Sequence, residues 1–458
     1  MIQRKAITYL QQWKERSDRK PLVLRGARQV GKTTLVKEFA KRYDVFLHLN
    51  IERKAEWNLF EQYDEINELI QAIFLQKKQT MNSGSVLLFI DEIQNSPKAV
   101  AILRYFYEEA GHIHVIAAGS LLETVMDVRK ISFPVGRVEY LAIRPCSFLE
   151  FLNGINNDFD AELIENLNAT SVHDRIMKLF NDYTLVGGMP AVISKYAENQ
   201  NILSLKRIYD SLLQSYKDDI EKYTKNTPTI KIIREILETG WMSAGSIITF
   251  EKFGGTSFSS KEMSLAFQTI QKAMLLELVF PTSTTRMPLL PNRRQRPKLI
   301  WLDTGLVNFV ADIQQEVFSV KDIQDVWRGR IAEHITAQEL LTLSDSLLAR
   351  RIFWKRDKQG SEAEVDFIYK YNSRAIPVEV KSGHNSKLKS LHLFMDESPH
   401  NFAVRVWSQP LSVDKVSTST GKSFNLINLP FYYIGVIDKV LDKYASLLTD
   451  TPQSAATK

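Results

Sequence analysis

A glycine-rich stretch near the N-terminus has the residue types that bind phosphate groups. Residues 26–33 read Gly-Ala-Arg-Gln-Val-Gly-Lys-Thr, which fits the pattern G-x-x-x-x-G-K-[ST]. In that pattern backbone N–H groups converge on phosphate oxygens, the lysine reaches the β and γ phosphates, and the hydroxyl binds Mg²⁺. The stretch therefore predicts a nucleoside triphosphate site with Lys32 on the phosphates and Thr33 on the metal. The binding residues that we expect are Gly26, Ala27, Arg28, Gln29, Val30, Gly31, Lys32, Thr33 and Thr34.

Two adjacent carboxylates follow a strongly apolar run further along the chain. Residues 86–90 read Val-Leu-Leu-Phe-Ile, and Asp91 and Glu92 come directly after them. A buried parallel strand delivers its C-terminal residues to the same sheet edge as the glycine-rich loop. There Asp91 can hold the magnesium shell, and Glu92 can orient and deprotonate the attacking water. A solvated turn is the alternative for such a pair, but its combination with the loop favours catalysis.

The segments around these residues have the patterns of the elements that must position them. The apolar run 21–25 predicts a buried strand, and residues 34–41 have helical spacing. Another apolar run, 114–119, predicts a strand that ends at Ser120, beside Asp91. Ser120 is therefore a candidate sensor of the γ phosphate, and capping of the helix after it is an alternative that is compatible with sensing.

The N-terminal third resembles the AAA+ ATPases of a large prokaryotic group. The resemblance rests on the segments GARQVGKTT, LLFIDEIQ, AAGS and SFPVGRVEYLAIRPCSFLEFL. It covers residues 1–155 and implies ATP and Mg²⁺ as cofactors. It also makes Arg137 a candidate arginine finger that acts on the ATP of a neighbouring subunit in a homo-oligomer. A surface arginine in a turn at a strand edge is the alternative for Arg137.

The middle of the chain combines helical patterns with a pair of strands. Residues 183–190 end in Gly-Gly-Met-Pro, and this turn with the helices after it resembles the second module of these ATPases. Residues 153–174 lack clean periodicity, which predicts a connection or lid. Helices followed by two strands, 276–280 and 298–302, suggest a winged helix.

The loop between those two strands is basic. It holds several cations with almost no acid nearby, namely Arg286, Arg293, Arg294, Arg296 and Lys298. If the loop is a wing, it can lie along the backbone of DNA, where each neutralised phosphate adds salt-dependent affinity. A solvated loop tip is the alternative. Winged helices also bind proteins, so the fold does not identify the partner.

A second group of charged residues follows a change of pattern near residue 327. From there the sequence predicts one helix, three short strands, a second helix and another strand. That order resembles the PD-(D/E)XK nuclease fold, and Asp366, Glu379 and Lys381 stand where the fold carries its signature. Because alternate residues of a strand share a face, these side chains can point the same way.

The nuclease resemblance implies a metal site. Asp366 and Glu379 would bind one or two hard divalent cations, Mg²⁺ or Mn²⁺, whose water ligands become the nucleophile. Lys381 would stabilise charge on phosphate or aid water deprotonation, and Glu333 on the preceding helix matches the accessory acid. The alternative is a nuclease-like scaffold used for binding, with Glu379 and Lys381 as a surface pair of little energetic weight.

Length and composition limit the class of protein and the number of domains. The chain has 458 residues, of which 44% are hydrophobic and 24% charged, with a formal net charge of +6. This length predicts about three domains. No apolar run approaches the roughly 20 residues of a membrane span, and the charged N-terminus is unlike a signal peptide, so we expect a cytoplasmic protein. The single cysteine, Cys146, excludes a disulfide framework and a Cys-based zinc site.

These patterns predict three structural units. An α/β P-loop NTPase domain of the AAA+ class spans residues 1–155, and a helical lid with a winged-helix-like domain spans 156–315. An α/β restriction-endonuclease-like domain spans 316–435, and residues 436–458 form a tail. The favoured function is ATP hydrolysis that controls a nuclease-like domain acting on DNA. The alternatives are a nucleotide-dependent DNA-binding switch or a protein-interaction switch whose C-terminal domain does not cut.

Overall fold

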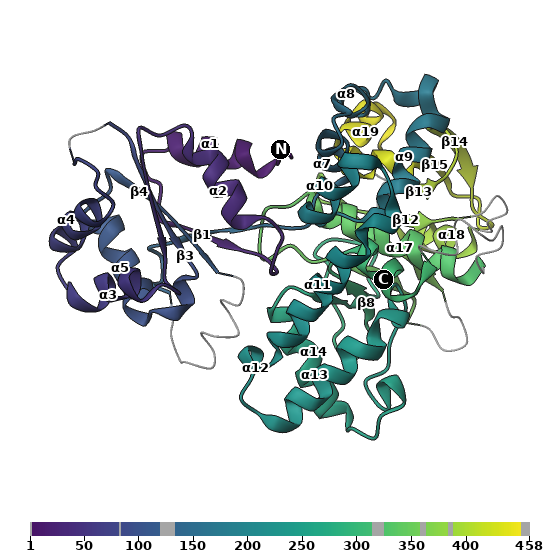
Figure 1. Cartoon of the computed structure of the whole chain (residues 1–458). Coiled ribbons are helices and arrows are strands. Elements are labelled where there is room, and N and C mark those ends of the chain that lie inside the picture. The colour runs from purple at the N-terminus through teal and green to yellow at the C-terminus, as the bar shows by residue number, and fades with distance from the viewer. Residues whose placement is uncertain are drawn as a thin grey trace, which may run out of the picture.

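The computed structural model describes residues 2–81, 84–119, 133–313, 325–357, 363–382 and 388–449. The N-terminal α/β unit lies on one side of the molecule, and the C-terminal sheet lies on the other (Figure 1). Helices from the middle of the chain pack between them. Within the described residues, no helix combines the length and apolar character that a membrane crossing requires.

The N-terminal unit is built on a parallel sheet of five strands in the order β2-β3-β4-β1-β5. The strands are β1 (Leu22–Arg25), β2 (Val45–Asn50), β3 (Val86–Asp91), β4 (Ile113–Gly119) and β5 (Glu139–Ala142). β4 separates β1 from β3, so the loop after β1 and the carboxylates after β3 leave the same edge two strands apart. The predicted strands in this unit are confirmed.

Helices cover both faces of this sheet because its strands are apolar on both sides. Leu87 and Phe89 of β3 share a core with α1 and α2, whereas Leu88 and Ile90 share a second core with α3, α4 and α5. This alternation is the period of two that a strand imposes. The helices are α1 (Ala6–Glu15), α2 (Lys32–Ala40), α3 (Lys54–Gln62), α4 (Ile66–Gln76) and α5 (Pro97–Glu108).

The middle of the chain is helical. Residues 153–174, in which the sequence suggests a connection or lid, contain α8 and pack Ala161, Ile164 and Ala169 into the core. These three side chains are buried although the segment shows no clean period, whereas Phe159 of α8 is 65% exposed. The helices are α7 (Phe148–Gly154), α8 (Asp158–Glu165), α9 (His173–Val186), α10 (Pro190–Asn199), α11 (Lys206–Asp218), α12 (Ile220–Tyr223), α13 (Thr227–Thr239), α14 (Ser260–Lys272) and α15 (Thr304–Val310).

The two strands predicted after these helices form an antiparallel pair, β6 (Leu276–Val279) with β8 (Lys298–Trp301). Their connecting loop is not a free wing. Its first residues form β7 (Pro281–Thr282), which pairs with β9 (Phe353–Lys355) of the C-terminal unit. Leu289 of the same loop is buried in the C-terminal core. The loop therefore ties the middle of the chain to the C-terminal unit.

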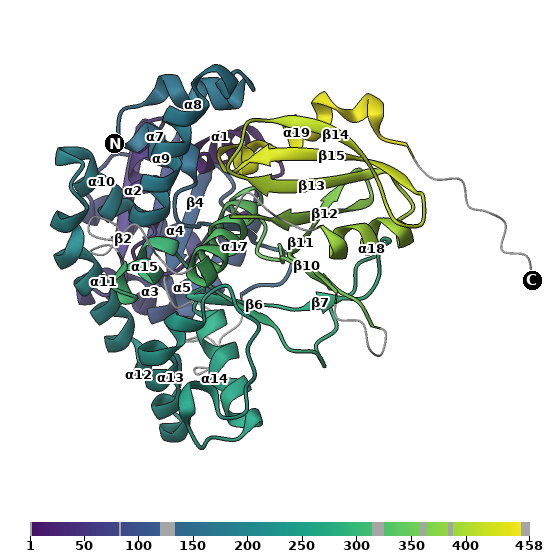
Figure 2. The same ribbon diagram turned by 90° about the vertical axis from the view of Figure 1, so that its right-hand side faces the viewer.

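The C-terminal unit has the order of elements that the sequence predicts, with further strands added. Its main sheet has the order β11-β12-β13-β15-β14, and α18 covers one face (Figure 2). A two-residue strand, β10 (Glu364–Val365), instead pairs with β9. The remaining elements are α17 (Asp325–Thr342), β11 (Phe367–Tyr371), β12 (Arg374–Val380), α18 (Lys389–Glu397), β13 (Phe402–Trp407), β14 (Ser412–Ser417) and β15 (Ser423–Pro430).

The last described residues correct the expected tail. Residues 436–449 include α19 (Ile437–Lys443), whose Val440 and Leu441 are fully buried. Tyr371 of β11 donates a hydrogen bond to Asp442 at 2.6 Å. The segment looks polar in sequence because one face of a short helix is solvated, but its other face completes the C-terminal core.

The C-terminal unit also contacts the N-terminal unit directly. The backbone N–H of Ala142, at the end of β5, donates to the carbonyl of Asp345 at 2.9 Å. The N–H of Phe148 donates to the carboxylate of Glu339 on α17 at 3.1 Å. The three units are therefore packed as one assembly around the end of α17.

Candidate functional site

The glycine-rich loop connects β1 to α2 in the geometry that the motif requires. β1 ends at Arg25, and α2 begins at Lys32. Gly31 has φ +92°, a conformation that favours glycine. A side chain at Gly26 would meet the carbonyl oxygen of Ile143 at 2.3 Å, so only glycine fits. The first turn of α2 has N–H groups without acceptors inside the helix, and they face the loop.

Lys32 is buried in this loop without a carboxylate partner. Its side chain amine donates to the carbonyls of Gly26 at 2.9 Å and Ala27 at 2.8 Å. The residue is 7% exposed, and burial lowers the pKa of its ammonium to about 8. In the described part of the chain, no carboxylate forms an ion pair with it. A buried cation held only by neutral oxygens fits the binding of an anion such as a triphosphate.

Thr33 and Asp91 provide the oxygens that suit Mg²⁺. The Thr33 hydroxyl donates to Asp91 Oδ2 at 2.8 Å, which brings the two predicted ligands together. The sequence does not single out His48 of β2, whose Nε2 lies 3.7 Å from the same oxygen. Hydroxyl and carboxylate oxygens are hard ligands, so Thr33 and Asp91 fit a magnesium ion. That ion would neutralise charge on the phosphates of bound ATP.

Glu92 leaves the sheet directly after Asp91. Its backbone is left-handed, with φ +54°, and its carboxylate accepts a hydrogen bond from the Gln94 side chain. Burial raises the pKa of Glu92, which improves a carboxylate as a proton acceptor. The position fits the predicted role in activating water.

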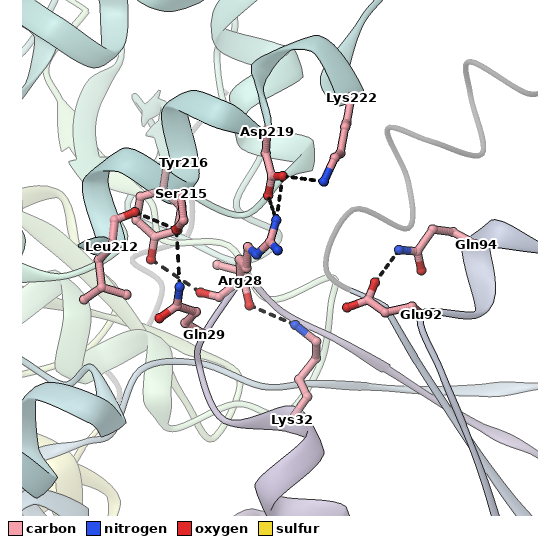
Figure 3. A network of polar contacts seen from close by, with 11 residues as sticks. Arg28, Gln29, Lys32, Glu92, Gln94, Leu212, Ser215, Tyr216, Asp219 and Lys222 are labelled. Carbon is pink, nitrogen blue, oxygen red and sulfur yellow. Dashed lines mark hydrogen bonds and ion pairs between the residues drawn. The ribbon is translucent and has the colours of Figure 1, made fainter. Parts of the chain in front are cut away.

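Two loop residues contact the middle of the chain (Figure 3). The Arg28 guanidinium lies 2.5 Å from the Asp219 carboxylate, which is 1% exposed and follows α11. Lys222 of α12 reaches the same carboxylate at 2.8 Å. Gln29 donates to the hydroxyl of Ser215 on α11 at 3.4 Å. These side chains therefore dock the loop on α11 and α12, a role that nothing in the local sequence indicates.

Arg4 is another residue that sequence reasoning missed. Its guanidinium donates to the loop carbonyl of Val30 at 3.1 Å and to the carbonyl of Arg144 at 2.7 Å. It also pairs with Glu150 at 3.1 Å. Arg4 thus supports the loop from behind. It stands in no motif, and a charged residue at an N-terminus gives no signal of such a role.

One further predicted residue, Arg137, is not brought to the loop. Arg137 pairs with Glu108 at 2.6 Å and is 40% exposed. It precedes β5, whose first residue Glu139 is level with Leu22 at the start of β1, so it lies at the opposite sheet edge from the loop. Arg137 can act as a finger only on another copy of the chain, and that role stays a prediction. Ser120 lies outside the described residues.

Two of the predicted nuclease carboxylates, Glu333 and Asp366, lie beside the ammonium group of Lys298, a residue that the sequence predicts to contact DNA instead. Lys298 of β8 lies 2.9 Å from Glu333, 2.8 Å from Glu364 and 3.2 Å from Asp366. Its side chain is only 3% exposed. The rings of Phe353 and Phe367 lie within 5.6 Å of the same ammonium. The prediction that Lys298 contacts DNA is wrong, because the strand pairing of β8 turns its side chain inward.

Glu379 and Lys381 complete this cluster. The pairing of Phe367 with Val378 places Asp366 opposite Glu379. Asp366 accepts the backbone N–H of Val380 at 2.8 Å, and Glu379 pairs with Lys381 at 2.8 Å. The second oxygen of Glu379 is buried without a hydrogen-bond partner. The structure therefore brings Glu333, Asp366, Glu379 and Lys381 together, as the sequence suggests.

The carboxylates of this cluster are paired with lysine ammonium groups of the same chain. Burial, and then the charge of Asp366, raise the pKa of Glu333 to about 7 and that of Glu379 to about 8. Burial alone would lower the pKa of Lys298, but the surrounding carboxylates outweigh it and raise that pKa. Among the described residues, no three His, Cys, Asp or Glu side chains are arranged to hold a metal ion. In this arrangement the cluster does not fit a divalent cation, because Lys298 stands among its oxygens.

The other basic residues of the β6–β8 connection remain at the surface. Arg286, Arg293, Arg294 and Arg296 are exposed, as the loop prediction requires. Contact with DNA stays a prediction for these four residues.

Family comparisons divide the chain into three matched segments. Residues 18–152 match the AAA domain family, residues 177–317 match the domain of unknown function DUF8612, and residues 328–420 match DUF4143. The first match confirms an N-terminal α/β P-loop ATPase domain of the AAA type, which binds and hydrolyses ATP. The winged-helix-like and nuclease-like assignments stay predictions. A search of curated proteins found no match.

Solved structures with similarity to the chain include a Walker-type ATPase, an ORC2 protein and a branch migration motor. The Walker-type ATPase PABY2304 of Pyrococcus abyssi is 13% identical with a TM-score of 0.42, over 68% of this chain and 96% of that one. The ORC2 protein of Aeropyrum pernix is 12% identical with a TM-score of 0.27, over 69% and 93%. The RuvB branch migration motor of Thermotoga maritima is 15% identical with a TM-score of 0.29, over 64% and 93%.

Proposed function

We propose that the chain is a Mg²⁺-dependent ATPase switch, in which the nucleotide held by the glycine-rich loop controls the packing of the middle and C-terminal units. The observation that carries the first part is the contact of Thr33 with Asp91 at 2.8 Å, beside a buried Lys32. Lys32 would hold the phosphates, Thr33 and Asp91 the metal, and Glu92 would accept a proton from water.

Contacts of the loop with α11 and α12 support the second part. Arg28 and Gln29 belong to the nucleotide loop, yet their side chains bind Asp219 and Ser215. Any shift of the loop on nucleotide binding must therefore change, or be resisted by, these contacts. A ligand that favours one loop position shifts the equilibrium between the two arrangements of the units.

The ATPase proposal is tested by turnover of Mg·ATP by the intact chain and by Lys32→Ala. We expect the substitution to lower turnover by at least about a hundredfold, because it removes a charge-assisted contact to the phosphates. Lys37→Ala is the matched control, since Lys37 lies on the same helix but is exposed. Equal activity of intact chain and Lys32→Ala would place hydrolysis elsewhere.

For the C-terminal unit we favour the alternative that it does not cut nucleic acid in this arrangement. Lys298 supports that choice, because its ammonium contacts Glu333 and Asp366, two of the three acids predicted to hold the metal. The rival proposal is a nuclease-like domain whose cleavage of DNA is governed by ATP. Glu379 supports it, since one of its buried oxygens has no hydrogen-bond partner.

A cleavage assay separates the two proposals. The intact chain is incubated with single-stranded and duplex DNA, with Mg²⁺ or Mn²⁺, and with or without ATP. The non-cutting switch predicts no strand scission above that of Asp366→Ala. Metal-dependent scission that Asp366→Ala abolishes would establish the nuclease proposal instead.

A further inference from the structure

A cavity of about 440 Å³ lies where the three units meet. The end of β1 and the segment 143–145 form the wall on the ATPase side. α14 and β6 form a second wall, and the end of α17 with residues 347–352 forms the third. The predicted roles of the glycine-rich loop and the carboxylate cluster do not use this space.

Positive charge dominates the lining. Six of the lining residues are basic, namely Arg25, Arg144, Lys272, Arg293, Arg350 and Arg351. Glu277 is the one acidic residue among the described residues of the lining. Glu277 forms an ion pair with Arg351, whose guanidinium lies 2.6 Å from the Glu277 carboxylate. Both side chains are more than nine-tenths buried.

Two of the arginines are held by neutral partners. Arg350 donates to the carbonyls of Leu347 and Ala349, each at 2.9 Å. Arg144 reaches the carbonyl of Ser346 at 3.4 Å, while its Nε is buried without a hydrogen-bond partner. Burial lowers the pKa of Arg144 to about 10, because it outweighs the nearby charge of Glu277, which raises that pKa. These two guanidinium groups are positioned in advance, and the hydrogen bonds described for them go to neutral carbonyl oxygens.

The rest of the lining is apolar or carries amides. Met274, Phe280 and Ile352 contribute apolar surface, and Gln268 contributes an amide. A ligand that suits this lining combines negative charge with a flat, partly apolar body. The volume lies within the range of about 300 to 1,000 Å³ that small-molecule sites occupy, and it is too small for a duplex.

We propose that this cavity binds a nucleoside phosphate, either free or at the end of a single strand. The phosphate would lie against Arg144, Arg293 and Arg350, because guanidinium groups bind phosphate oxygens in pairs. The nucleoside would lie against the apolar wall. Arg25 and Ala27 connect the cavity to the glycine-rich loop, although the proposal does not depend on hydrolysis there.

Calorimetric titration of the full chain tests this site. The glycine-rich loop is first filled with Mg·ADP, and the same titrations are repeated on Lys32→Ala. Thymidine 5′-monophosphate probes a free nucleotide, the 5′-phosphorylated dinucleotide pTpT probes a strand end, and thymidine is the uncharged control. We expect one saturable site for at least one phosphorylated probe in both samples. Binding of pTpT alone would identify a strand end as the ligand.

Neighbouring arginines provide the matched variants. Arg293 lines the cavity and Arg294 does not, although both are exposed residues of the same loop. Arg293→Ala should weaken binding by about tenfold, the effect of one lost charged contact, and Arg294→Ala by less than about twofold. Arg144→Gln should also weaken it.

Several results would overturn the proposal. Equal losses for Arg293→Ala and Arg294→Ala would mean diffuse attraction to a basic surface. Binding that disappears in Lys32→Ala, or that Mg·ADP displaces, would belong to the glycine-rich loop. Failure of both phosphorylated probes to saturate, or equal binding of thymidine, would also remove the site. A failure of ATP turnover alone would leave the cavity proposal unaffected.

Discussion

The glycine-rich loop and the C-terminal carboxylate cluster both bury charge, but they balance it in different ways. Lys32 lies against two carbonyl oxygens, and no described carboxylate pairs with it. Glu333 and Asp366 contact the ammonium of Lys298, which comes from a strand of another unit. A buried charge is costly unless it is paired. In the loop the opposite charge must come from a bound ligand, whereas in the cluster it comes from a lysine of the same chain.

This difference indicates which site is ready for chemistry. Binding of an anion stabilises a loop that holds a cation without a carboxylate partner. A cluster that already holds an ammonium must lose that contact before a metal can enter. The first region is therefore a binding site as it stands, and the second acts as a link between β8 and the C-terminal unit.

The largest expected effect comes from removing the internal cation. Lys298→Met keeps the length of the side chain but leaves three carboxylates without their shared ammonium. We expect the free energy of unfolding to fall by about 3 to 5 kcal/mol, the cost of breaking a buried ion pair on one side. Urea denaturation measures it, with Lys370→Met on β11 as an exposed control.

Added Mn²⁺ sharpens the same experiment. If the cluster is a metal site that Lys298 blocks, Mn²⁺ should restore much of the stability lost in Lys298→Met and leave the intact chain unchanged. A loss of less than about 1 kcal/mol would mean that the ammonium contributes little, contrary to its burial.

The next effect concerns the other region. Glu92→Gln removes the proposed proton acceptor and keeps the shape of the side chain, so ATP should still bind. We expect turnover to fall by about 10² to 10⁴, the usual contribution of general base catalysis. Turnover and nucleotide affinity are measured together, with Glu68→Gln on α4 as an exposed control. Unchanged turnover would show that another group activates the water.

Glu339 is a buried acid of a different kind from those of the carboxylate cluster, because its hydrogen-bond donors are neutral. The hydroxyl of Tyr183 donates to it at 2.7 Å and the N–H of Phe148 at 3.1 Å. Burial raises the pKa of Glu339 to about 7, so the folded chain binds this proton more tightly than the unfolded chain. Its contribution to stability is present below about pH 4.5 and is lost as pH rises through 7.

Glu339→Gln should remove that pH dependence. Between pH 5 and pH 8 we expect the intact chain to lose about 2 kcal/mol relative to the variant, measured by urea denaturation at each pH. Parallel pH profiles for the two proteins would mean that Glu339 does not titrate in this range.

The smallest effect concerns the contact between the loop and the middle helices. Arg28→Ala and Asp219→Asn, combined in a double-mutant cycle, should give a coupling energy of about 0.5 to 1 kcal/mol, since solvent screens the half-exposed Arg28. Lys222→Ala is the control, because Lys222 binds the same carboxylate from outside the loop. If the contact transmits nucleotide state, the coupling measured with Mg·ADP bound will differ from that of the free chain.

Local patterns were sufficient for the N-terminal site. Eight consecutive residues define the glycine-rich loop, and the apolar run before Asp91 predicts a buried strand, so each functional side chain is positioned by its own segment. The resemblance to a nuclease fold identified Asp366, Glu379 and Lys381, and the pairing of β11 with β12 places Asp366 opposite Glu379. Local patterns failed for Lys298, whose basic neighbours in sequence suggest a surface role.

The sequence by itself determined the parallel strands, the phosphate loop and the residue types at both sites, because these depend on interactions within one segment. Only the tertiary structure decided that Lys298 fills the carboxylate cluster, that Arg28 binds Asp219 and that six cations surround a cavity. These contacts join residues far apart in the chain. Their geometry is set by how whole elements pack, and no local spacing records it.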